Sequence, residues 1–192
     1  MVMPTARDAS VVLLDTSPIV SFSEDGALRQ LSLYLGRRAA IALDVHRELT
    51  RLSRARFRSL RRLQDLGWPS GEPQALPPYL LADAVQLQRL EVQHSTLRPG
   101  HAGEIATALL AGQLRSRGVL VIMDDRLGRR LLRFRGIAFL TSVQLALEMA
   151  SQDALDEREA RAVYAQASPE ELDRFEQRLA SARASVGSAR RP

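Results

Sequence analysis

The sequence predicts an α/β fold in which a parallel β-sheet lies between helices, with a helical extension at the C-terminal end. Short runs of consecutive apolar residues, typical of strands buried on both faces, alternate with longer segments of helical spacing. Parallel strands need crossover connections, so this alternation favours a parallel sheet. The 192 residues, of which 45% are hydrophobic, suffice for one domain with a sizeable core.

Four apolar runs are expected to form the strands, and they cover residues 11–14, 39–43, 119–123 and 137–140. Ser17 and Pro18 follow the first run and predict a helix N-cap and first helical residue, because proline has no N–H to lose there. Asp44 likewise predicts the N-cap of a helix that reaches about residue 66. Further helices are expected at 18–35 (with a break at 24–26), 79–92, 102–117, 127–134 and 142–150.

The last part of the chain differs from the rest in composition. Residues 153–166 are helical in spacing and highly charged, and Ser168 to Glu171 form a capping box with proline in the first position. We therefore expect a core domain over 1–150, a helical hairpin over 151–185 and a disordered tail over 186–192.

Composition excludes several kinds of chemistry. The chain has no cysteine, and all 27 of its basic residues are arginine, so thiolate, disulfide and lysine-amine chemistry are ruled out. The net charge of +5 is compatible with a nucleic-acid partner. No run approaches membrane-spanning length and no signal-peptide core is present, so we expect a cytoplasmic location and no membrane partner.

Acidic residues recur at one place in the predicted fold. Asp15 ends the first strand, Glu48 lies just past the second, and Asp124 and Asp125 end the third. Glu104 begins the helix that precedes the third strand. Because the carboxyl ends of parallel strands meet at one edge of a sheet, these carboxylates should converge there.

Clustered carboxylates repel one another and are normally held together by a cation. An oxygen-only ligand set suits Mg²⁺ or Mn²⁺, and such a site typically serves phosphodiester hydrolysis by activating water and neutralising phosphoryl charge. Each acid also has a structural explanation: a turn aspartate, a solvated helix residue, or a carboxylate that stabilises a helix dipole. The repeated placement favours the metal site.

Four segments, in this order, resemble PIN-domain ribonucleases, and among them the VapC-type toxins of toxin–antitoxin pairs: LLDTSPI (13–19), VHREL (45–49), GEIATA (103–108) and IMDDRLGRR (122–130). The resemblance implies a parallel sheet flanked by helices, a Mg²⁺ or Mn²⁺ site and endonucleolytic cleavage of RNA. By position, Asp15, Glu48 and Glu104 match the first three family acids. The fourth is Asp125 by its spacing from Arg126, while Asp124 fills a neighbouring position.

The resemblance therefore implies that Asp15, Glu48, Glu104 and Asp125 are catalytic. It also implies metal ligands among Asp15, Glu104, Asp124 and Asp125. Thr16 and Ser17 either bond these carboxylates or cap the helix. The implied partners are RNA and a small antitoxin protein. The surplus C-terminal hairpin suggests either a second copy of the chain or another docked partner. The C-terminal hairpin lies outside the resemblance.

A stripe of arginines follows the second acid. Arg47, Arg51, Arg54 and Arg58 recur at three- and four-residue steps, and few acids offset them. They form either a solvated helix face, a track for RNA phosphates, or a surface for an acidic antitoxin segment. We favour the RNA track. The competing function for the whole chain is a PIN-like scaffold that binds a partner protein or nucleic acid without cleaving it.

Overall fold

Four parallel strands form the centre of the fold in a computed structural model that describes residues 5–24, 26–55, 68, 73–94, 102–164 and 177. The strands are β1 (Val11–Leu14), β2 (Ala39–Ala40), β3 (Val119–Ile122) and β4 (Phe139–Leu140), in the order β2-β1-β3-β4. Every pairing is parallel, and Val11 of β1 lies opposite Val119 of β3. The predicted α/β class with a parallel sheet is confirmed.

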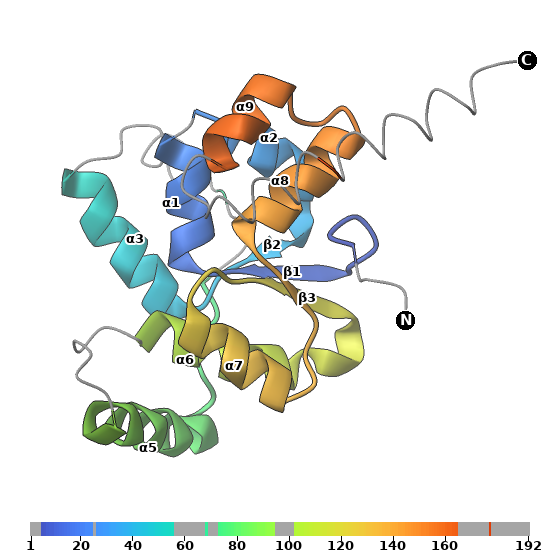
Figure 1. The fold of residues 1–192 in the computed structure, drawn as a ribbon. Helices are drawn as coiled ribbons and strands as arrows, with labels where there is room; N and C mark the ends of the chain where they lie inside the picture. Colours follow the sequence, from blue (N-terminus) through green and yellow to red (C-terminus); the bar gives the residue numbers. More distant parts are fainter. Residues whose placement is uncertain are drawn as a thin grey trace, which may run out of the picture.

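Helices cover both faces of this sheet (Figure 1). On one face lie α1, α2, α8 and α9, and on the other lie α6 and α7, with α5 packed outside α6. Helix α3 lies at the side of the sheet and contacts both α1 and α6. The bounds are α1 Thr16–Glu24, α2 Leu28–Leu35, α3 Leu43–Ala55, α5 Pro78–His94, α6 Ala102–Gln113, α7 Arg126–Phe134, α8 Ser142–Ser151 and α9 Glu157–Tyr164. Short 3-10 helices at Gly36–Arg38 and Arg115–Arg117 lead into β2 and β3.

The two central strands form the buried middle of the sheet. Leu13 and Leu14 of β1 and Val121 and Ile122 of β3 are completely buried, as the unalternated apolar runs predict. The outer strands are shorter than predicted. After β2, Ala42 makes only an isolated bridge to Gln74, because α3 already begins at Leu43.

Two predicted helix starts are wrong by two residues. Helix α1 begins at Thr16, so Pro18 lies in the third helical position rather than the first. Proline is tolerated there because the first four N–H groups of a helix have no partner within the helix. Helix α3 begins at Leu43, which places Asp44 inside the first turn, where it pairs with Arg47 at 3.2 Å instead of capping the helix.

The start of the C-terminal segment joins the main core. In α9, Ala160 and Val163 are buried together with residues of α8 and the sheet. Apart from residue 177, the predicted hairpin beyond 164 and the predicted tail at 186–192 lie outside the described residues. Within the described ranges, the helices are too short or too polar to cross a membrane.

Candidate metal and phosphodiester site

Asp15 stands at the carboxyl end of β1, at the centre of the sheet edge. Its backbone N–H donates to the carbonyl of Ile122 at 3.1 Å, which extends the ladder between β1 and β3 by one residue. The residue is only 1% exposed. The sheet therefore fixes the backbone of Asp15 and holds its carboxyl group away from solvent.

Few hydrogen bonds or opposite charges compensate for the burial of the Asp15 carboxyl group. Neither of its oxygens has a hydrogen-bond partner of ordinary geometry among the described residues. Burial raises the pKa of Asp15 well above its usual value, the charges of Glu104, Glu48 and Asp124 raise this pKa further, and the backbone amide of Thr16 opposes the shift. A buried carboxylate of this kind must either take up a proton or meet a cation.

Two packed helices bring Glu48 and Glu104 toward Asp15. Glu48 lies on α3, and its Oε2 accepts a 2.6 Å hydrogen bond from the hydroxyl of Thr16. Glu104 lies in the first turn of α6, where the helix dipole favours a carboxylate, and its Oε2 is shielded from solvent. Thr16 thus bonds a carboxylate, one of the two roles predicted for it, whereas Ser17 is exposed.

Gly103 lies between these acids. A Cβ atom at this position would stand 3.4 Å from Glu48 Oε2 and 3.7 Å from Asp15 Oδ1. The absence of a side chain therefore leaves a small space against both carboxylates. The glycine is part of the GEIATA segment, but its role depends on packing between α3 and α6 that the sequence does not reveal.

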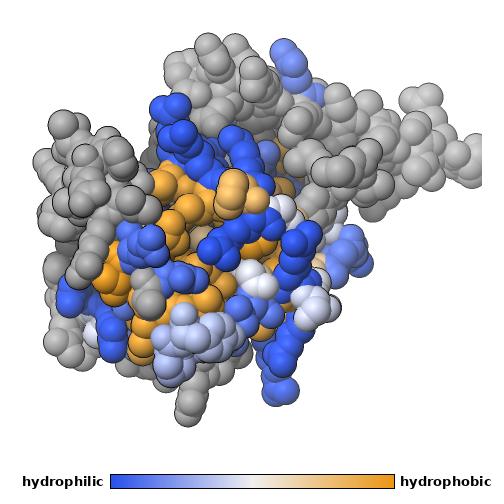
Figure 2. Space-filling model, turned by 90° about the horizontal axis from the view of Figure 1, so that it is seen from below, coloured by the Kyte–Doolittle hydropathy of each residue, from blue (hydrophilic) through white to orange (hydrophobic). Residues whose placement is uncertain are grey.

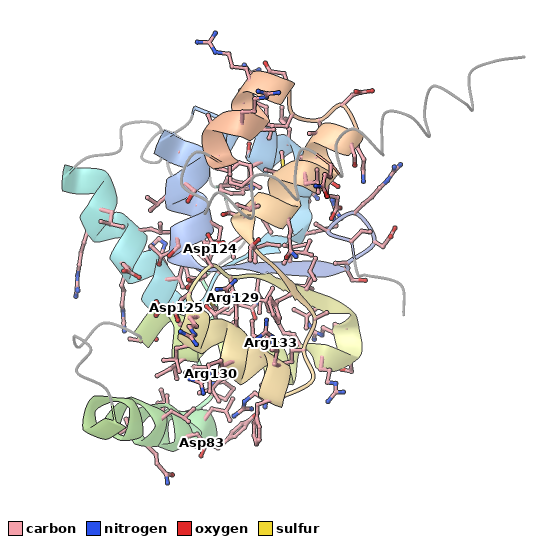
Figure 3. All side chains as sticks on the ribbon, viewed as in Figure 1. Asp83, Asp124, Asp125, Arg129, Arg130 and Arg133 are labelled. Atoms are coloured by element: carbon pink, nitrogen blue, oxygen red, sulfur yellow. The ribbon has the colours of Figure 1, made fainter. Side chains whose placement is uncertain are left out.

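The structure separates the roles of the adjacent aspartates. Asp124 Oδ1 accepts hydrogen bonds from the backbone and hydroxyl groups of Ser142 at 2.8 and 3.0 Å, and its charge acts on Asp15. Asp125 is the N-cap of α7, and its Oδ1 accepts from the backbone N–H of Gly128 at 2.9 Å. Figure 3 labels both residues where α7 begins. The charge of Asp124 therefore acts on Asp15, whereas the side chain of Asp125 caps the N-terminus of α7.

The donor set suits a hard cation without forming a complete preformed cage. The shielded oxygens of Asp15 and Glu104 are the ligands that Mg²⁺ and Mn²⁺ prefer. No three His, Asp or Glu side chains in the described ranges have the geometry of a finished metal site. Mg²⁺ usually keeps several waters and takes only one or two carboxylates, so these residues fit it on chemical grounds.

The predicted arginine stripe is described only in part. Arg47 and Arg51 are exposed on α3, and Arg54 lies in its last turn. Arg58 lies outside the described residues. Arg47 is partly offset by Asp44, at a site where both side chains are open to solvent.

Sequence reasoning passed over a second group of arginines, on α7. This helix carries Arg126, Arg129, Arg130 and Arg133 and contains no acidic residue. The signal was present in the sequence, because the four positions follow the helical spacing of three and four residues. The predicted stripe on α3 is longer in the sequence and lies next to Glu48.

Comparisons of this chain with models of protein families, with curated proteins and with solved structures found no match. What the residues can do must therefore follow from their own placement. That placement brings a buried carboxylate, three further acids and the first turns of two arginine-bearing helices to the carboxyl edge of the sheet.

Proposed function

We propose that the chain is a Mg²⁺- or Mn²⁺-dependent endoribonuclease that hydrolyses RNA phosphodiester bonds, and that it is the toxin of a toxin–antitoxin pair. The observation that carries the proposal is Asp15, a buried carboxyl group whose oxygens have no hydrogen-bond partner of ordinary geometry among the described residues, and on which the charges of three acids act. Such a group destabilises the fold when it is ionised, so a role in binding a cation gives a reason for its presence.

Asp15, Glu104 and Asp124 are the residues that would hold the cation. Bound there, a divalent cation supplies activation of a water molecule and neutralisation of charge on the phosphoryl oxygens. Glu48, which the Thr16 hydroxyl orients, would act as the general base that accepts a proton from the attacking water. Arg47 and Arg51, which are exposed on the helix that carries Glu48, would bind neighbouring phosphates of the substrate.

The competing function is a scaffold that binds RNA or a partner protein without cleaving it. The observation that favours this scaffold is the lack of a finished three-ligand group among the described residues. The two functions differ in one testable respect. A nuclease needs the charge of Asp15 for its activity, whereas a scaffold needs only the fold.

The deciding experiment measures cleavage of a labelled single-stranded RNA by purified protein in Mg²⁺, in Mn²⁺ and in EDTA. We expect cleavage in either metal, none in EDTA, and none for Asp15→Asn in any buffer. The matched control is Asp153→Asn, because Asp153 is exposed and has a φ of 56°, a backbone conformation that asparagine tolerates well. Equal cleavage by wild type and Asp15→Asn, or none by wild type, would overturn the nuclease.

The toxin role is tested separately by expression in bacterial cells. We expect the wild-type chain to arrest growth from the cytoplasm, Asp15→Asn to permit growth, and co-expression of a cognate small antitoxin to restore it. Light scattering on the purified protein tests whether a second copy of the chain is also a partner. Growth arrest by Asp15→Asn equal to that by wild type would exclude RNA cleavage as its cause.

A further inference from the structure

Helix α7 presents a continuous face of positive charge. Arg126, Arg129, Arg130 and Arg133 lie within an arc of about 100° at 3.6 residues per turn. Arg126, Arg130 and Arg133 are exposed and Arg129 is half-buried. None of the four forms an ion pair with any residue in the described part of the chain.

The opposite face of α7 fixes the direction of these arginines. Gly128 and Leu132 are buried, Leu132 as part of the main core, and α7 packs on α6. A Cβ atom on Gly128 would come within 2.6 Å of the Met123 sulfur, so the helix lies close against the end of β3. The arginine face is thus turned away from the closely packed, buried face of the helix.

The stripe starts at the acidic site. Asp125 caps α7, Asp124 precedes it, and the labelled arginines follow along the helix in Figure 3. A ligand that lies on this face and has one end at Arg126 would reach the edge where Asp15 stands. Because the acids repel an anionic ligand in the absence of a cation, the arginines must supply the attraction that brings it there.

The far end of the stripe carries an exposed aromatic residue. Phe134 is 92% exposed, and the guanidinium of its neighbour Arg133 lies 5.5 Å from the centroid of the Phe139 ring. Figure 2, which looks onto the layer of helices below the sheet, shows hydrophilic side chains around an apolar area. Arginines beside an exposed ring are the combination that binds the phosphates and stacks on the bases of single-stranded nucleic acid.

We propose that the arginine face of α7, with Phe134 at its end, is the track on which single-stranded RNA lies as it enters the acidic site. The proposal rests on the nuclease function proposed above and assigns its substrate path. It differs from the α3 stripe in that none of its arginines forms an ion pair within the described residues, whereas Arg47 is paired with Asp44. An acidic protein segment is the competing occupant, and the test below separates the two.

The test measures binding of a fluorescent single-stranded RNA in EDTA over a range of salt concentrations, so that cleavage plays no part. Arg130→Gln combined with Arg133→Gln should weaken binding roughly tenfold and reduce the slope of log K against log salt by about 1.4, since each phosphate contact on a single strand contributes about 0.7. The matched control combines Arg37→Gln and Arg117→Gln. Both of these arginines are exposed, and both precede strands, at the opposite edge of the sheet.

The aromatic residue is tested by Phe134→Ala, with Leu33→Ala on α2 as the control at a side chain that is 72% exposed. Phe134→Ala should weaken RNA binding roughly tenfold and leave the salt slope unchanged, because stacking releases no counterions. The control should bind as wild type does. Equal affinity for Phe134→Ala and wild type would overturn the stacking role.

Other outcomes also decide. RNA binding whose salt slope is the same in wild type and in the α7 double variant overturns the track and leaves the nuclease proposal intact. If the protein binds RNA through α7 in a salt-dependent way but never cleaves it, the nuclease proposal is overturned and the RNA track on α7 is supported. A polyglutamate peptide of the same charge that binds α7 more tightly than RNA identifies an acidic protein as the occupant, which overturns the track.

Discussion

The hydroxyl of Thr16 donates a 2.6 Å hydrogen bond to Oε2 of Glu48, linking the first residue of α1 to α3 across 32 positions of sequence. Thr16 is 7% exposed, so water competes poorly for this bond. The bond orients a carboxylate that faces Asp15 across the space beside Gly103. It places Thr16 as a positioning residue for the proposed reaction.

Thr16→Val should therefore lower both stability and cleavage. Valine keeps the shape of threonine but removes the donor, and a hydrogen bond to a charged group contributes about 1.5–3 kcal/mol. Denaturant unfolding should show a loss of about that size, and cleavage should fall through kcat more than through KM. Thr16→Ser is the control, because serine keeps the hydroxyl. A serine variant as impaired as the valine variant would mean that the methyl group, rather than the bond, matters.

Asp15→Asn should change how stability depends on pH. Because the pKa of Asp15 is raised in the folded chain above its ordinary value of 3.8, the folded state binds more protons than the unfolded state between these two values. The contribution of Asp15 to the free energy of unfolding is thus most favourable below the unfolded value and declines as pH rises toward the folded value. The asparagine variant lacks this decline and should be the more stable protein near neutral pH.

The measurement is denaturant unfolding of both proteins in EDTA from mildly acidic to neutral pH, with the difference between them plotted against pH. We expect the wild type to lose stability relative to Asp15→Asn as pH rises. Added Mg²⁺ or Mn²⁺ should then stabilise the wild type and leave the variant unchanged, since a cation held by the Asp15 carboxylate binds the folded state in preference to the unfolded state. If the stability difference between the two proteins changes neither with pH nor with added metal, Asp15 carries no buried charge.

Much of the fold follows from local patterns. The position of Asp15 could be predicted because an unalternated apolar run marks a strand buried on both faces, and parallel strands align their carboxyl ends. The first residue of α1 could not be predicted, because proline is tolerated at several positions in the first turn of a helix.

The site depends more on contacts between distant residues. Asp124 and Asp125 are chemically identical, and what separates them is Ser142, which lies 18 positions beyond Asp124 and bonds that residue alone. Thr16 and Glu48 likewise meet only because α1 and α3 pack together. Sequence spacing can predict that acids lie at one edge of the sheet, but it does not predict which carboxylate oxygen accepts a hydrogen bond from which donor.

Gly103→Ala should reduce cleavage in a folded protein. The added methyl group would stand 3.4 Å from Glu48 Oε2 and 3.7 Å from Asp15 Oδ1, which is contact without a severe clash. It would fill the space against both carboxylates and further desolvate Asp15. Because alanine favours a helix over glycine by up to about 1 kcal/mol, the protein should be no less stable.

Gly112→Ala on the same helix is the matched control, since its nearest neighbour would be Arg135 Nη1 at 3.5 Å, far from the acids in the sequence of α6. It should gain the same helix propensity and keep its activity. The two variants are compared by thermal unfolding and by RNA cleavage in Mn²⁺. Full activity in Gly103→Ala would show that the space beside the carboxylates is not used.

Asp124→Asn and Asp125→Asn should differ in their effect on cleavage. Asparagine can still accept the hydrogen bonds from Ser142 at position 124, and it remains a good N-cap at position 125, so both variants should keep the fold. Asp124→Asn removes a charge that acts on Asp15, and we expect it to lose most of its cleavage and its stabilisation by metal. Asp125→Asn should retain both.

Asp125→Ala completes the comparison, because alanine removes the acceptor for the Gly128 N–H as well as the charge. It should lower the free energy of unfolding by about 1 kcal/mol, the usual cost of losing an N-cap. Its cleavage at a temperature well below the unfolding transition should stay close to that of wild type. Loss of cleavage in Asp125→Asn but not in Asp124→Asn would contradict this assignment. The carboxylate of Asp125, and not that of Asp124, would then take part in the reaction.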